Sequence, residues 1–191
     1  MNILKAKIRG QLFRLSCLLF RRRINIGEGI VLQSRLKIKG PGKVIIGKNC
    51  HINKLPGDDK QYVTFNTHSS KAVIRIGDSA RLSAIRISSK FSVEIGNDFL
   101  AEETGIVDTD FHTIERGRGE PLNESYDRCK IKIGDNVAIG AKSILTKGVR
   151  IGNNVIVIPG SIVIFPIQDN LIVGGNPAKQ LKPYKTSLQF Y

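Results

Sequence analysis

The sequence predicts an all-β solenoid, in which each turn of a flat-sided coil stacks on the turn before it. Aliphatic residues recur at every sixth position of one long block: Ile133, Ile139, Leu145, Ile151, Val157 and Val163. Glycine follows three of them directly, at Gly134, Gly140 and Gly152, and supplies backbone angles that sharp corners need. A period of six matches neither an amphipathic helix nor an alternating strand. Hexapeptide periods are typical of β-helices, so we predict one inward aliphatic on each flat side.

The same period divides the rest of the chain. We expect the coil to occupy residues 24–170, with excursions at 54–71 and 100–130, where the repeat is broken. The second break is long enough to form a protruding loop, and long loops in compact repeats are often functional. Residues 171–191 are expected to be a C-terminal tail outside the stack.

Residues 1–23 predict a basic amphipathic helix. Ile8, Leu12, Leu15 and Leu19 recur at helical spacing. The segment has no acid, and its basic residues are Lys5, Lys7, Arg9, Arg14, Arg21, Arg22 and Arg23. Two interpretations stay open, and both can hold. The helix caps the open end of the coil or packs on a neighbouring subunit, or it makes a peripheral contact with an anionic membrane.

Composition limits the classes of partner and the compartment. The net charge of +14 favours polyanions, acidic headgroups or phosphorylated ligands. The three cysteines, Cys17, Cys50 and Cys129, form no paired framework, which favours a reducing cytoplasm. The apolar run at 15–20 is too short to cross a bilayer and lacks a cleavage site, so we expect neither a transmembrane span nor a signal peptide.

The second break contains the candidate catalytic residues. His112 follows two carboxylates in the sequence Asp108-Thr109-Asp110-Phe111-His112. A neutral imidazole can take a proton from an attacking hydroxyl or amine, and a nearby carboxylate can fix its tautomer. On chemistry alone, a general base and an ordinary surface or core histidine both remain open.

The repeat block, the Asp108–His112 stretch and the ending Gly174-Gly175-Asn176-Pro177-Ala178-Lys179 together resemble the hexapeptide-repeat acyltransferases. The resemblance is greatest to the sugar O-acetyltransferases, including galactoside, maltose, capsule and lipopolysaccharide enzymes, over about residues 72–183. It implies a left-handed parallel β-helix, a homotrimer, and acetyl-CoA bound at subunit interfaces without a metal. It also implies that His112 is the general base and that a saccharide hydroxyl is the acceptor. Asp110 is then a candidate for orienting His112, and Asp108 for binding the acceptor.

The resemblance also implies positions that contact CoA. Small residues lie along the pantetheine arm in these relatives, and basic residues of the tail meet the phosphates. The matching positions here are Gly140, Ala141, Pro159, Gly160, Lys179 and Lys182. Two departures concern the same region. Ala138 replaces a common tryptophan, and Ile164-Phe165 replaces a common Thr-Lys pair, which puts one adenine or phosphate contact in doubt.

Three alternative functions compete with O-acetyl transfer. The first is N-acetyl transfer to a nucleotide-linked amino sugar, and the second is a non-enzymatic basic binding module. Nucleic acid is not expected, because aromatics are only 6% of residues and no RNA-binding motif is present. The third is a metal enzyme of carbonic-anhydrase type, which needs converging histidines, whereas His51, His68 and His112 are widely spaced. The expected location is the cytoplasm, or the inner face of its membrane.

Overall fold

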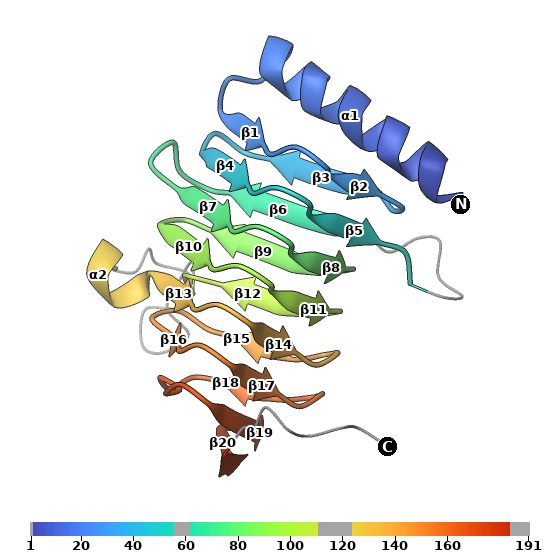
Figure 1. Cartoon of the computed structure of the whole chain (residues 1–191). Helices are drawn as coiled ribbons and strands as arrows, with labels where there is room; N and C mark the ends of the chain where they lie inside the picture. The colour runs from blue at the N-terminus through green and yellow to red at the C-terminus, as the bar shows by residue number, and fades with distance from the viewer. Residues whose placement is uncertain (1, 56–61, 111–123, 184–191) are drawn as a thin grey trace.

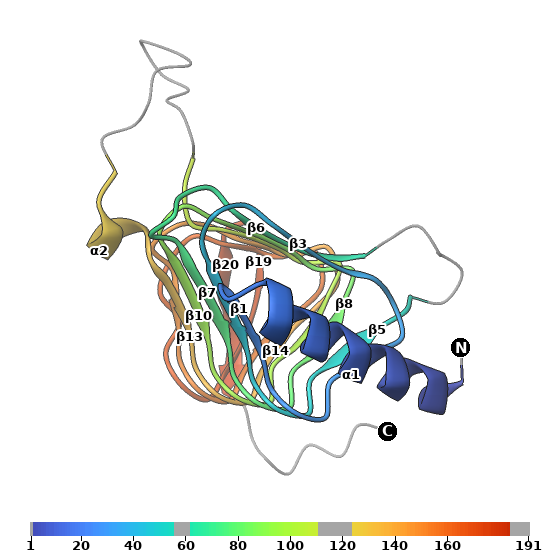
Figure 2. The ribbon, with the colours of Figure 1, turned by 90° about the horizontal axis from the view of Figure 1, so that it is seen from above.

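In the residues that it describes (2–55, 62–110 and 124–183), the computed structural model is a β-helix with three sheets of mainly parallel strands and a helix across its first coil (Figure 1). Each coil gives a strand in turn to sheets A, B and C, and the cross-section is triangular (Figure 2). Seen from the helix end, the chain turns counter-clockwise as it recedes, so the coil is left-handed. The predicted fold class is confirmed.

The strands follow each other around the coil in chain order. Sheet A contains β1 (Ile24–Ile26), β4 (Lys43–Ile46), β7 (Val73–Ile76), β10 (Ser92–Ile95), β13 (Ile131–Ile133) and β16 (Arg150–Ile151). Sheet B contains β2 (Val31–Leu32), β5 (His51–Asn53), β8 (Arg81–Ser83), β11 (Leu100–Glu102), β14 (Val137–Ile139), β17 (Val155–Val157), β19 (Leu171–Gly175) and β20 (Ala178–Pro183). Sheet C contains β3 (Leu36–Lys39), β6 (Val63–Thr67), β9 (Arg86–Ser89), β12 (Gly105–Val107), β15 (Ile144–Leu145) and β18 (Ile162–Val163).

The core is a set of aliphatic columns that run parallel to the coil axis. In sheet A the parallel register stacks one isoleucine on the next: Ile26, Ile46, Ile76, Ile95, Ile133 and Ile151. Each of these side chains is at most 5% exposed. The predicted inward residues of sheets B and C, including Ile139, Leu145, Val157 and Val163, are buried as well. The six-residue period therefore identified the core correctly.

The corner between sheets A and B is held by a repeated side-chain contact, which we call the Asx ladder. Its members are Asp78, Asn97, Asp135, Asn153 and Asp169. In each, Oδ1 accepts a hydrogen bond of 2.6–2.8 Å from a backbone N–H one coil earlier. The residue after each member has a positive φ, at Ser79, Asp98, Asn136, Asn154 and Asn170. Asn and Asp tolerate this conformation better than other non-glycine residues.

The glycine before each of the first four ladder residues leaves room for the coils to approach. A Cβ added at Gly96 would lie 2.3 Å from Asp135 Oδ1 and 2.7 Å from the Gly134 carbonyl carbon. Both distances are far below van der Waals contact. Glycine is thus required at this corner by the closeness of the next coil.

Two predicted excursions are shorter than expected. Segment 54–71 contains β6, which pairs with β3 and β9, so the coil resumes by Val63. Segment 100–130 begins with β11 and β12, which remain in sheets B and C, and it ends in the short helix α2 (Tyr126–Cys129). These strands lack the six-residue spacing of the main block, but neighbouring coils supply their hydrogen bonds and buried contacts.

The C-terminal segment also differs from its prediction. Residues 171–175 form β19, which pairs in parallel with β17 and extends the stack, and β20 folds back antiparallel on β19. The prediction of a tail outside the stack over 171–191 is therefore wrong for these strands. The antiparallel return covers the last edge of sheet B, which would otherwise offer unpaired backbone groups.

The N-terminal helix α1 (Ile3–Phe20) lies across the first coil and contacts β1 and β2 (Figures 1 and 2). Its small residues Ala6, Gly10 and Cys17 are buried against the coil. A Cβ on Gly10 would lie 2.1 Å from the Ile30 carbonyl oxygen, so glycine allows this close packing. The predicted cap is confirmed. No described helix is long and apolar enough to cross a membrane.

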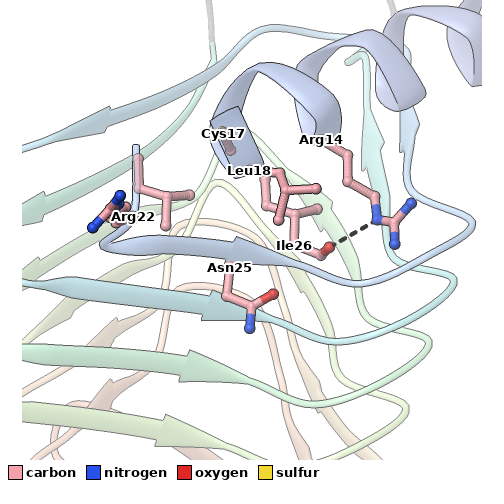
Figure 3. Close-up of a pocket in the computed structure, with 7 residues that line it drawn as sticks. Arg14, Cys17, Leu18, Arg22, Asn25 and Ile26 are labelled. Atoms are coloured by element: carbon pink, nitrogen blue, oxygen red, sulfur yellow. Dashed lines mark hydrogen bonds between the residues drawn. The ribbon is translucent and has the colours of Figure 1, made fainter. Parts of the chain in front are cut away.

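Arginine side chains fix α1 to the coil. Arg14 Nε donates to the Ile26 carbonyl oxygen at 3.2 Å, beside a hollow of about 280 Å³ between α1 and β1 (Figure 3). Arg14 also pairs with Glu28 at 3.4 Å, and Arg9 donates to the Ser34 carbonyl. The helix is held at its edges by these contacts and at its centre by small residues.

The Asx ladder predicts a stability effect at one residue. Asp135→Ala leaves the Asn97 amide without its acceptor, and we expect the free energy of unfolding to fall by about 1 kcal/mol. Urea denaturation at matched protein concentration measures this loss. Asp127→Ala is the control, because that exposed carboxylate makes a surface ion pair with Lys130, and we expect no measurable change. Equal stabilities of the two variants would show that the ladder does not stabilise the coil.

Candidate active site

Acids and lysines gather at the corner between sheets C and A, where the coil is interrupted. Asp108 and Asp110 follow β12, and Glu124 precedes α2 by two residues. The Asp110 amide donates to Glu124 Oε1 at 3.1 Å, which joins the two ends of the interruption. We call this cluster the loop corner: Lys90, Asp108, Asp110, Glu124 and Lys147. His112, the expected base, falls between Asp110 and Glu124 and lies outside the described residues.

Asp108 has a structural place in the wall. Its side chain is fully buried, and its carboxylate accepts hydrogen bonds from Ser89 Oγ at 2.6 Å and from the amides of Lys90 and Phe91 at 2.7 and 2.9 Å. These donors belong to the turn one coil earlier. The expected acceptor-binding role is not supported, because the carboxylate is enclosed and its oxygens are already occupied.

Asp110 and Lys147 form the exposed side of the loop corner. The Asp110 carboxylate is about half exposed and pairs with Lys147 Nζ, which also lies 3.5 Å from Glu124 Oε1. The hydrogen bond to Asp110 is the main cause that raises the pKa of Lys147, and the charges of Asp110 and Glu124 add to it, while burial opposes the shift. Asp110 is thus positioned by a cation at the start of the segment that contains His112, and its catalytic role stays a prediction.

Glu124 is the buried anion of the loop corner. Its side chain is only 4% exposed. Burial alone would raise the pKa of its carboxyl, but hydrogen bonds from Thr109, the Asp110 amide and Lys90, with the charge of Lys147, lower it overall. The carboxylate therefore stays ionised and holds both ends of the interruption together. The sequence does not single out Glu124, Lys90 and Lys147, because no local pattern distinguishes them from solvated charges.

Four of the six predicted CoA-contacting residues share one corner. Gly140 and Ala141 follow β14, and Pro159 and Gly160 follow β17 one coil later, at the corner between sheets B and C. The Gly160 amide donates to the Ala141 carbonyl at 2.8 Å, so the two pairs are stacked. A Cβ added at Gly160 would have no atom within 4 Å, which leaves an open surface at this position. We call the surface formed by Gly140, Ala141, Pro159 and Gly160 the small-residue corner.

The two predicted basic contacts lie on the last strand of sheet B. Lys179 pairs in register with Gly174 and Lys182 with Ile172, so both belong to β20. The Gly175 amide donates to Ser161 Oγ at 3.2 Å, which places the Lys179 end of β20 beside the small-residue corner. Lys182 lies about 10 Å further along the strand. Both side chains are exposed, and their contact with phosphates stays a prediction.

The other singled-out residues are spread over the coil. His51 lies on β5 in sheet B, whereas His68 follows β6 at the corner between sheets C and A, so the structure does not bring these two together. Burial, Arg81 and Lys7 lower the pKa of His51. Ala138 is partly exposed on β14, and Ile164 and Phe165 are exposed after β18. Among the described residues, no three metal-ligating side chains form a cluster.

The fold is that of the hexapeptide-repeat acyltransferases. A mutant of AntD, an N-acyltransferase from Bacillus cereus solved with dTDP and coenzyme A, matches 90% of this chain and 88% of its own with a TM-score of 0.67 at 19% identity. A hexapeptide-repeat acetyltransferase from Vibrio cholerae, solved with acetyl-coenzyme A, matches 73% and 70% with a TM-score of 0.58 at 25% identity. The expected resemblance is confirmed.

Relatives by sequence also carry the name acetyltransferase. A provisionally named acetyltransferase of Saccharomyces cerevisiae is 37% identical over 111 residues, which cover 57% of this chain and 55% of the relative. The galactoside O-acetyltransferase of Lactococcus lactis is 35% identical over 86 residues, 44% of this chain and 39% of the relative. The chain thus spans about half or less of these relatives. No family model matches it.

From the ionised Glu124 in the loop corner we expect the free energy of unfolding to fall at acid pH. Because the folded pKa of Glu124 is below its reference value of 4.5, its carboxylate stabilises the protein above pH 4.5, and this contribution is lost as the pH falls through the folded pKa. Glu124→Gln should cost about 2 kcal/mol at pH 7, since the lysines lose their buried anion. Urea denaturation from pH 7 to pH 3 should show this difference shrinking.

Glu102→Gln is the control for that series, because Glu102 is exposed on β11. It should unfold like the wild type at pH 7. A Glu124→Gln variant as stable as this control would remove Glu124 from the support of the loop corner.

Proposed function

We propose that the protein is an acetyl-CoA-dependent O-acetyltransferase, which transfers the acetyl group to a hydroxyl of a sugar in a bacterial surface polysaccharide or its precursor. The observation with most weight is that one acyltransferase fold contains both an interruption fixed at its two ends and a small-residue corner. Asp110 and Glu124 join the ends of the segment that contains His112. Gly140, Ala141, Pro159 and Gly160 offer a smooth surface for an extended pantetheine arm.

The proposed reaction is a direct transfer. His112 removes the proton from the acceptor hydroxyl as its oxygen attacks the thioester carbonyl of acetyl-CoA. The carbonyl oxygen becomes an oxyanion, which a backbone amide near the inner face stabilises. Collapse breaks the carbon–sulfur bond, forms the acetyl ester, and releases the CoA thiolate, which takes the proton back from His112. Asp110 lies two residues before His112, within about 7 Å of chain, and can orient the imidazole.

The positions of the two corners support a site shared between copies of the chain. The loop corner lies where the chain leaves sheet C, and the small-residue corner lies where the chain enters sheet C. One chain therefore carries the loop corner and the small-residue corner at opposite ends of the sheet C strands. In a homotrimer, the loop of one copy can reach the small-residue corner of the next. The exposed side chains of Ile144, Ile164 and Phe165 on and after the sheet C strands would be covered by such a neighbour.

N-acyl transfer to a nucleotide-linked amino sugar is the second candidate. It is favoured by the fold similarity to the B. cereus N-acyltransferase, which was solved with dTDP and coenzyme A. A screen of CoA release with neutral glycans beside nucleotide-linked amino sugars separates the two candidates. We assign either reaction to the cytoplasm, where reduced thiols such as the buried, free Cys17, Cys50 and Cys129 persist.

Replacement of His112 tests the chemical step. We expect His112→Ala to lower turnover by about 10²–10⁴-fold, the usual contribution of a general base, with CoA affinity little changed. Thiol release measures turnover, and calorimetry measures CoA binding. His51→Ala on sheet B is the matched control and should turn over like the wild type. Undiminished turnover in His112→Ala would remove this residue from the mechanism.

Oligomeric state is the second test. Sedimentation equilibrium should give three times the chain mass of 21.1 kDa. A stable monomer with full activity would contradict a site built between copies.

A further inference from the structure

The outer face of α1 is apolar, although the helix also packs on the coil through its other face. Ala6, Gly10 and Cys17 face inward, at spacings of four and seven residues. Opposite them runs a stripe with a helical spacing of three and four: Leu4, Ile8, Leu12, Leu15 and Leu19. These five side chains are 47–68% exposed, and Leu18 and Phe20 at the helix end are 71% and 83% exposed. The stripe that would ordinarily cap the coil therefore points to solvent.

The charges around this stripe have one sign. Lys5, Lys7 and the run from Arg21 to Arg23 are exposed, and residues 1–23 contain no acid. The two arginines of α1 turn toward the coil, where Arg14 meets the Ile26 carbonyl (Figure 3) and Arg9 meets Ser34. Arg23, after the helix, donates to the Pro41 carbonyl but stays exposed. The cations left at the surface flank the apolar stripe and follow its end. Long basic side chains beside an apolar face are suited to a boundary between hydrocarbon and anions.

We propose that the outer face of α1 docks the protein on an anionic lipid surface. The stripe enters the boundary between headgroups and acyl chains, while Arg21–Arg23 and the two lysines meet the lipid phosphates. A second copy of the chain is a poorer occupant of this face. Two such helices packed together would bring cations of the same sign close to each other, with no acid on either helix to offset them.

The position of α1 gives the docked protein an orientation. The helix lies across the end of the coil, so the coil axis points away from the lipid surface (Figures 1 and 2). In the proposed trimer, three such helices would lie at the same end and bind together, which raises the effective affinity. The gain in affinity from three helices rests on the proposed trimer and function, whereas docking by one helix does not.

The same orientation suggests the class of acceptor. The loop corner follows β12, which is three strands along sheet C from β3 in the first coil. At the usual strand spacing, it lies about 14 Å beyond that coil, on the side away from the lipid. A saccharide attached to a lipid could present a sugar at that height while its anchor stays in the membrane. This step rests on the proposed function and deepens it.

Co-flotation with vesicles tests the docking without acetyl-CoA or acceptor, so its failure leaves acyl transfer untouched. The full chain should float with vesicles of phosphatidylcholine and phosphatidylglycerol and not with phosphatidylcholine alone. The double variant Leu12→Glu/Leu15→Glu should bind at least tenfold more weakly. The triple variant Arg21→Gln/Arg22→Gln/Arg23→Gln should lose on the order of 100-fold, since each cation near an anionic surface adds about fivefold.

Leu181→Glu is the control, because Leu181 is 56% exposed on β20 at the far end of the coil. It should float like the wild type, and circular dichroism should show that all variants fold. Docking is overturned if the wild type does not float or if the double glutamate variant floats equally well. Docking is also overturned if the double glutamate variant has half the particle mass of the wild type in solution. A second copy of the chain would then occupy the stripe in the wild type.

Discussion

The coil depends on a side-chain oxygen that reaches the backbone of the preceding coil at the corner between sheets A and B. Asp78, Asn97 and Asp135 are consecutive members of this ladder. Each supplies an acceptor to an amide that the sharp turn would otherwise leave without a protein partner. A preceding glycine such as Gly96 lets the coils come close enough for that bond. The ladder at the corner and the six-residue period therefore fix the same register. A shift of that register would separate every ladder pair and turn the inward aliphatic side chains outward.

Because the ladder fixes the register of the coils, the repeat can be interrupted at another corner and resume in the same register. Asp108 closes the wall where the chain leaves, by accepting hydrogen bonds from the turn at residues 89–91. Glu124 closes it where the chain returns, with Lys90 from the coil before and Lys147 from the coil after. The two carboxylates therefore fix both ends of the interruption. A functional loop on a rigid scaffold is a common arrangement in enzymes.

The six-residue period predicted the buried residues whose surroundings repeat from coil to coil. It did not predict residues whose burial or pairing depends on contact between segments far apart in the sequence. Inward residues such as Ile133 and Leu145 could be predicted, because their environment repeats with the chain. The buried face of α1 could not, since hydrophobicity favoured Leu12 and Leu15 whereas the close approach to Ile30 required Gly10. The pairing of Glu124 with Lys147 was hidden because it depends on where the interrupted chain re-enters the coil. The candidate base itself was suggested by resemblance and lies outside the described residues.

If the acyl-transfer site lies in a seam between two copies, different chains can supply its parts. Chains with His112→Ala keep an intact small-residue corner, and chains with Ala141→Phe keep an intact loop. Each variant alone should be nearly inactive, whereas equal amounts refolded together should recover about a quarter of wild-type turnover, from the mixed seams of a cyclic trimer. Turnover of the mixture no higher than that of the separate variants would contradict a site shared between copies.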